Sequence, residues 1–66
     1  MLYAKDYKSA KMYIGKNYDK HFFVKRTTVN CACGETDGFY IYDDHMKIID
    51  KIAICESCYH SHDNII

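Results

Sequence analysis

Two short stretches decide how this chain folds, Cys31-Ala32-Cys33-Gly34 and Cys55-Glu56-Ser57-Cys58, and together they hold all four of its cysteines. Twenty-one residues lie between Cys33 and Cys55, enough for a hairpin that brings the two pairs together. A 66-residue chain buries a core that contributes only ~3–5 kcal/mol, so it needs disulfides or a metal ion as well. The four cysteines are the residues that can supply either one.

The expected compartment favours metal over disulfides. The start of the chain, Met1 to Lys8, lacks the apolar stretch of a signal peptide. The most apolar segment, Met46 to Ile54, is interrupted by Lys47, Asp50 and Lys51 and falls short of the ~20 apolar residues that cross a bilayer. We therefore expect a cytoplasmic protein without membrane contact, in which thiols stay reduced and bind metal.

Four thiolates in two close pairs are the ligand set of a structural zinc site. The sequence resembles the zinc ribbon family, in which two cysteine knuckles at the ends of β-hairpins hold one zinc ion. Cys33-Gly34 matches the ending of the family's first knuckle and Cys55-Glu56-Ser57-Cys58 matches the second, so the resemblance covers about residues 28–62. It implies a small metal-stabilised β-rich domain with one structural Zn²⁺, which chelation should unfold.

The first pair departs from the family pattern, because one residue separates its cysteines where two are usual. In an extended strand such side chains share a face but lie too far apart for one ion, so a turn must bring Cys31 and Cys33 together. Gly34 can supply the backbone freedom for that turn. If it does not, His60 or His62 would provide the fourth ligand. Iron, a disulfide or free thiols are the remaining alternatives.

The N-terminal third predicts a short helix. Tyr3, Tyr7, Ala10 and Ile14 follow helical spacing, so we expect a helix over residues 3–14. The run Gly15-Lys16-Asn17 should end it, since glycine and asparagine tolerate the left-handed conformation.

The rest of the chain predicts β-strands. Residues 21–29 and Phe39–Tyr42 are rich in aromatic and β-branched side chains. Residues 46–54 fit a strand better than a helix, although Asp50 interrupts their alternation and Asp43 or Asp44 could cap a helix there. We thus expect one domain over residues 1–66: a helical or irregular extension (1–19), a zinc ribbon (20–62) and a tail (63–66).

The motifs argue against an enzyme. Four thiolates close the coordination sphere of zinc, whereas catalytic zinc keeps one position open for water. A thioredoxin-type dithiol needs a βαβ scaffold for which the chain is too short. Covalent haem attachment needs a histidine directly after the second cysteine, where Tyr59 stands. The deaminase motif needs a proline, which the chain lacks.

Charge is unevenly distributed. Residues 1–30 carry seven Lys/Arg and two acidic residues, and residues 31–66 carry two Lys/Arg and seven acidic residues. The acidic half predicts a protein-binding regulator, a phage factor in the host cytoplasm that docks on host transcription machinery. Phage origin is suggested by abundant Lys, Tyr and Ile, and zinc ribbons recur in transcription complexes. The expected docking residues are Phe39, Tyr40, Tyr42, Asp43 and Asp44.

The basic half supports an alternative function, binding of RNA or DNA. Cations alternate with aromatic side chains there, as in sites that stack bases and neutralise phosphates. The residues concerned are Lys20, Phe22, Lys25 and Arg26. Phe22 and Phe23 could equally build the core, and exposed tyrosines could form a homodimer interface.

Overall fold

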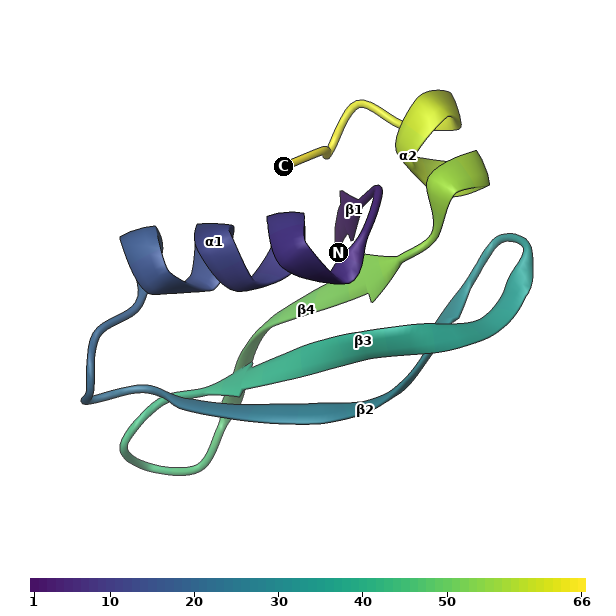
Figure 1. Cartoon of the computed structure of the whole chain (residues 1–66). Helices are drawn as coiled ribbons and strands as arrows, with labels where there is room; N and C mark the ends of the chain where they lie inside the picture. The colour runs from purple at the N-terminus through teal and green to yellow at the C-terminus, as the bar shows by residue number, and fades with distance from the viewer.

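A four-stranded sheet crossed by one helix forms the body of the protein, shown in Figure 1 as a computed structural model that describes residues 1–66. A second, shorter helix stands at one end of the sheet. The elements in chain order are β1 (Leu2–Ala4), α1 (Tyr7–Asn17), β2 (Phe23–Cys31), β3 (Gly34–Tyr42), β4 (Ile48–Ile54) and α2 (Glu56–Ser61). The domain is thus small and β-rich, as expected.

The strand order in the sheet is β1-β4-β3-β2. The hairpin of β2 and β3 pairs from Phe23 opposite Tyr42 to Cys31 opposite Gly34, so it places the first cysteine pair at its closed end. β4 runs antiparallel to β3, and β1 runs parallel to β4. β4 therefore ends at the same end of the sheet as that turn.

The helix α1 begins four residues later than the spacing predicts and ends three residues later. Asp6 is its N-cap: Oδ1 accepts a hydrogen bond of 2.7 Å from the backbone N–H of Ser9. Tyr3 lies in β1 instead, opposite Ala53. Gly15 does not stop the helix, because a glycine takes helical angles as readily as left-handed ones, and the helix runs on to Asn17.

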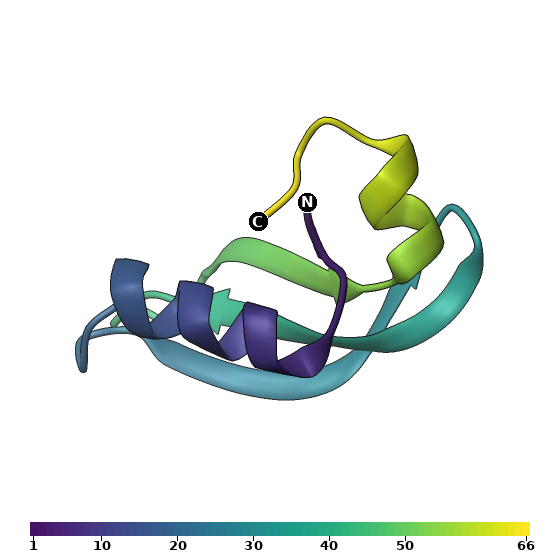
Figure 2. The ribbon, with the colours of Figure 1, turned by 45° about the horizontal axis from the view of Figure 1, so that its top comes forward.

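The two chain ends are part of the fold, and the expected extension and tail are hydrogen-bonded to each other. β1 is a strand of the sheet, and Ile65 bridges to Tyr3. Backbone hydrogen bonds join Tyr3 to Asn64 (2.9 Å) and to Ile66 (3.0 Å). The ends therefore lie side by side, as Figures 1 and 2 both show.

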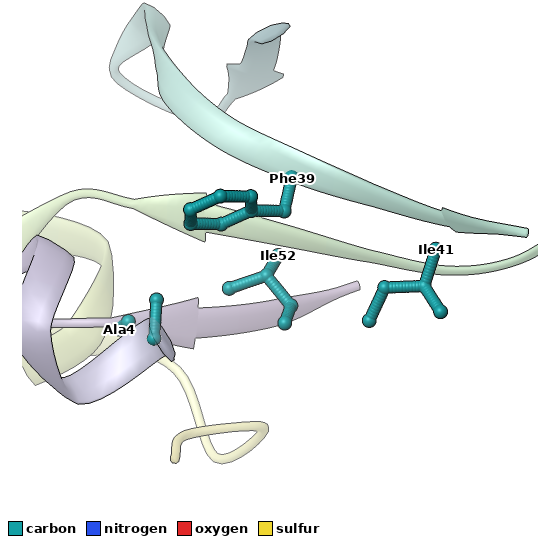
Figure 3. Close-up of a cluster of buried hydrophobic side chains, with 5 residues drawn as sticks. Ala4, Phe39, Ile41 and Ile52 are labelled. Carbon is teal, nitrogen blue, oxygen red and sulfur yellow. The ribbon is translucent and has the colours of Figure 1, made fainter. Parts of the chain in front are cut away.

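The core lies between α1 and one face of the sheet. Figure 3 shows Phe39, Ile41 and Ile52 pointing to the same side as Ala4. Phe39 is only 5% exposed, so its assignment to a docking surface is wrong. Side chains alternate along β3, and the face that carries Phe39 and Ile41 is the one that α1 covers.

The prediction of a strand within residues 46–54 is confirmed over Ile48–Ile54, and the strand contains a bulge. Tyr42 lies opposite Ile48 and Ile41 opposite Asp50, so Ile49 is an extra residue in β4. Asp50 lies opposite Ile41 on the face that α1 covers, and its carboxylate accepts a hydrogen bond of 2.9 Å from the Tyr18 hydroxyl. Burial and this carboxylate raise the pKa of Tyr18. The bond ties the end of α1 to β4.

Neither helix has the length and apolar character needed to cross a lipid bilayer.

Gly38 is a position where the fold tolerates no side chain. A Cβ there would overlap the main-chain oxygen of Ile52 and the side chain of Val29, whereas a Cβ on Gly15 in α1 would meet nothing. We expect Gly38→Ala to lower the free energy of unfolding by about 1–3 kcal/mol. Gly15→Ala should raise it by roughly 0.5–1 kcal/mol, because alanine favours helix. Urea unfolding measures both, and equal effects of the two substitutions would contradict this packing.

The Asp6 cap predicts a pH dependence. The hydrogen bond from the Ser9 N–H holds the pKa of Asp6 below 3.8, so the cap stabilises the protein above that pH and is lost as the carboxylate is protonated. Asp6→Ala should lower the melting temperature at neutral pH, while Asp6→Asn, which also caps helices well, should largely preserve it. The difference in melting temperature between Asp6→Ala and the parent protein should disappear in acid. A difference in melting temperature that persists at low pH would contradict stabilisation of the helix by the Asp6 carboxylate.

Candidate metal centre

The first cysteine pair lies in the turn between β2 and β3. Cys31 is the last residue of β2 and Gly34 the first of β3, so only Ala32 and Cys33 form the loop. Gly34 has φ +120°, a conformation that residues with a side chain rarely adopt. The Cys31 Sγ lies 3.3 Å from the Gly34 carbonyl oxygen. The predicted role of Gly34 in a tight turn is therefore confirmed.

The second pair lies where β4 gives way to α2. Cys55 follows Ile54, and its N–H donates to the Ala4 carbonyl at 3.1 Å, so β1 helps to place it. Cys58 is in the first turn of α2, three residues on, which brings both side chains to one side of the helix. The zinc ribbon resemblance implies a hairpin here, so at this pair the structure departs from that pattern.

All four sulfurs meet in one cluster. The Sγ atoms of Cys31, Cys33, Cys55 and Cys58 lie within 4.8 Å of one another. The Sγ atoms of Cys33 and Cys58 lie 3.6 Å apart, far beyond the S–S bond of about 2.0 Å, and no disulfide is present. The four converging thiols can bind one metal ion. The site lies at the surface of the domain, because Cys58 is buried and Cys33 is exposed.

The histidines are not part of this cluster. His62 stacks on the Tyr3 ring, with 4.6 Å between the ring centroids. His60 Nε2 lies 3.9 Å from a carboxylate oxygen of Glu56, one helical turn back. Both predicted substitute ligands therefore contact other groups, and the cluster consists of the four cysteines alone.

The cysteine thiols have different proton affinities. Removal from water raises the pKa of Cys58 and that of Cys31. The backbone N–H of Cys58 lowers the pKa of Cys55 by hydrogen bonding to its sulfur. A metal ion must displace the thiol protons to bind, so loading the cluster releases protons and is favoured by higher pH.

The cluster joins three parts of the chain. It connects the β2–β3 turn, the end of β4 and α2, which Figures 1 and 2 show beside that turn. Val29 and Ala53 are buried, but they lie outside the main core. The Thr36 hydroxyl bridges β3 to β4 by donating to the Ile54 carbonyl at 2.5 Å.

The docking residues predicted in the acidic half of the chain do not form one exposed surface. Tyr40 and Tyr42 are half-buried, and their ring centroids lie 6.4 Å apart. Asp43 is a turn residue whose Oδ1 accepts from the backbone N–H of His45 and of Lys47, both at 2.9 Å. With Phe39 in the core, Asp44 is the acid of the set that takes no part in the turn, and its Oδ1 lies 3.6 Å from Nε2 of His45.

The predicted nucleic-acid residues are separated as well. Phe22 packs against the core and contacts the Tyr18 ring at 5.2 Å, while Lys20 lies in the turn before it. Arg26 lies over the Tyr7 ring at 4.6 Å and pairs with Asp37 at 3.3 Å. Lys25 follows the alternation of β2 to the opposite face of the sheet.

The sequence matches no protein-family model and no curated protein, and the structure matches no solved structure. No family is therefore assigned to the chain, and its function has to be inferred from the cluster and the surfaces around it.

The structure predicts that cysteines, not histidines, bind the metal. Cys33→Ser removes one ligand without opening the core, because Cys33 is exposed. The variant should bind Co²⁺, which serves as a spectroscopic probe, roughly 100-fold more weakly. This loss corresponds to about a quarter of the binding free energy of a four-ligand site. His60→Ala with His62→Ala should leave affinity and spectrum unchanged. A spectral shift in the histidine variant would place a nitrogen in the coordination sphere.

Proposed function

We propose that the protein binds one structural Zn²⁺ through Cys31, Cys33, Cys55 and Cys58 and serves as a non-enzymatic binding module. The observation that carries the proposal is the convergence of four sulfurs within 4.8 Å. Sulfurs at about 2.3 Å from a tetrahedral zinc ion are about 3.8 Å apart, close to the 3.6 Å between Cys33 and Cys58. Small movements of the side chains would complete the tetrahedron.

A structural role follows from the ligand set. Four thiolates fill the tetrahedral sphere of zinc and leave no position for a water or a substrate. No histidine or carboxylate joins the four sulfurs in the cluster, so no side chain there is placed as a general base. The site is suited to holding chain segments together rather than to chemistry.

The energetic need for such a link is clear from the burial. Only nine residues are buried, and the main cluster holds five of them. Bound zinc contributes on the order of 10 kcal/mol to the folding of small domains, more than this core can supply. Zinc would therefore fix α2 and the β2–β3 turn against β4.

The function that such a scaffold supports is binding of a macromolecular partner by a surface of the sheet. A rigid β-hairpin presents side chains with little loss of conformational freedom on binding. The docking surface expected from the sequence is reduced to Tyr40, Tyr42 and Asp44, since Phe39 is in the core and Asp43 holds a turn. Tyr40 and Tyr42 remain available on the sheet.

Metal analysis of the purified protein tests the zinc proposal. We expect mass spectrometry of the metal content to find one zinc ion per protein chain. Removal with a chelator under reducing conditions should abolish the far-ultraviolet circular dichroism of the fold, because the core alone is too small. Adding Zn²⁺ should restore the spectrum, and adding Mg²⁺, which prefers oxygen ligands, should not. Unchanged dichroism after complete zinc removal would refute the structural role.

A further inference from the structure

At the end of the sheet away from the cysteines, the face opposite α1 carries no helix. Phe39, Ile41 and Ile52 point to α1, so their neighbours along the strands point the other way. Figure 1 shows α1 on one side of the hairpin and no helix on the opposite side. We use the name open face for the surface made by five side chains at the end of the sheet away from the cysteines. They are Phe23, Lys25, Tyr40, Tyr42 and Lys51.

The strand register brings these side chains into two rows. Lys25 lies opposite Tyr40, and Tyr40 lies opposite Lys51, so a lysine flanks the central tyrosine on each side. In the next row Phe23 lies opposite Tyr42. Tyr40 and Tyr42 contact each other, with 6.4 Å between ring centroids. The result is an aromatic platform of Tyr40 and Tyr42, whose ring planes are inclined by 62°, with Phe23 opposite Tyr42 and a lysine on each side of Tyr40.

The cations of the open face have no acidic partner within the protein. None of the ion pairs includes a lysine. Lys51 instead places its ammonium 5.5 Å from the centre of the Tyr40 ring. Asp50, beside it in the sequence, faces α1 and binds the Tyr18 hydroxyl. The face therefore carries a local positive charge although the whole chain is neutral.

The aromatic rings are accessible in part. Phe23 is 52% exposed, and Tyr40 and Tyr42 are half-buried between their strand neighbours. Rings held at fixed positions on a sheet can stack on planar bases without losing side-chain freedom, and lysines beside them can neutralise phosphates. A protein interface fits less well, because lysine is depleted at the centres of such interfaces.

We propose that the open face binds single-stranded nucleic acid. Bases stack on Tyr40, Tyr42 and Phe23, and Lys25 and Lys51 contact the phosphates. A duplex is excluded from this mode because its bases are already stacked on each other. The inference rests on the proposed function in one respect, since the zinc ion holds the hairpin that carries the platform. It assigns Lys51, Tyr40 and Tyr42 to nucleic-acid contact in place of Phe22 and Arg26.

Fluorescence anisotropy with a labelled oligodeoxythymidylate tests the proposal on the zinc-loaded protein. Tyr40→Leu should weaken binding by roughly tenfold or more, whereas Tyr40→Phe, which keeps the ring, should bind like the parent. Lys25→Gln with Lys51→Gln should reduce the slope of log affinity against log salt by about 1.4, for two lost phosphate contacts on a single strand. A matched duplex should bind more weakly than the single strand.

The control variant is Lys8→Gln with Lys16→Gln, which removes the same charge from exposed positions on α1. It should leave the single-strand contacts in place and change the salt slope little. Equal losses in the two lysine variants, or no binding by the parent, would overturn the proposal. So would a stoichiometric protein partner, resistant to nuclease, whose capture depends on Tyr40, because it would assign the face to protein.

Zinc content and circular dichroism of every variant separate the two proposals. A protein that holds one zinc ion, keeps its fold and fails to bind the oligonucleotide contradicts only the nucleic-acid inference. A protein that folds and binds the oligonucleotide after zinc removal contradicts only the structural role of the metal.

Discussion

The four cysteine sulfurs lie within a few ångströms of one another, and the positions of three elements depend on that convergence. The β2–β3 hairpin must end, β4 must stop and α2 must begin at the same point in space. Each pair reaches this point by a different local route: a two-residue turn closed by Gly34 at φ +120°, and the first turn of a helix. A metal ion bound at this point would give a short chain a link that its small core cannot provide.

The two ends of the sheet are stabilised by different means. At the cysteine end, burial is limited to a few side chains such as Val29 and Ala53, so a metal ion bound by the cysteines would contribute most there. At the other end α1 covers the sheet, and the hydrogen bond from Tyr18 to Asp50 fixes the helix to β4. At the end away from the cysteines, this division leaves the face opposite α1 without a helix. Its lysines and aromatic rings are the basis of the proposed nucleic-acid contact.

The sequence carried enough information to predict the cysteine cluster and the strand character of residues 46–54. Metal ligands need particular residue types at short spacing, and this signal is local. The sequence signal for the N-cap at Asp6 is local too, yet the apolar spacing from Tyr3 predicted an earlier start of the helix α1. The pairing of β1 with β4 joins residues about fifty positions apart, so no local pattern reveals it. The burial of Phe39 was equally hidden, because it depends on which face α1 covers.

The most direct test of the metal-held fold is X-ray absorption at the zinc edge of the purified protein. Coordination by the four cysteines predicts a single shell of four sulfurs at about 2.3 Å. The same shell should persist when His60 and His62 are replaced by alanine. A shell that includes nitrogen or oxygen ligands, or fewer than four sulfurs, would contradict the convergence of the cysteines on one ion.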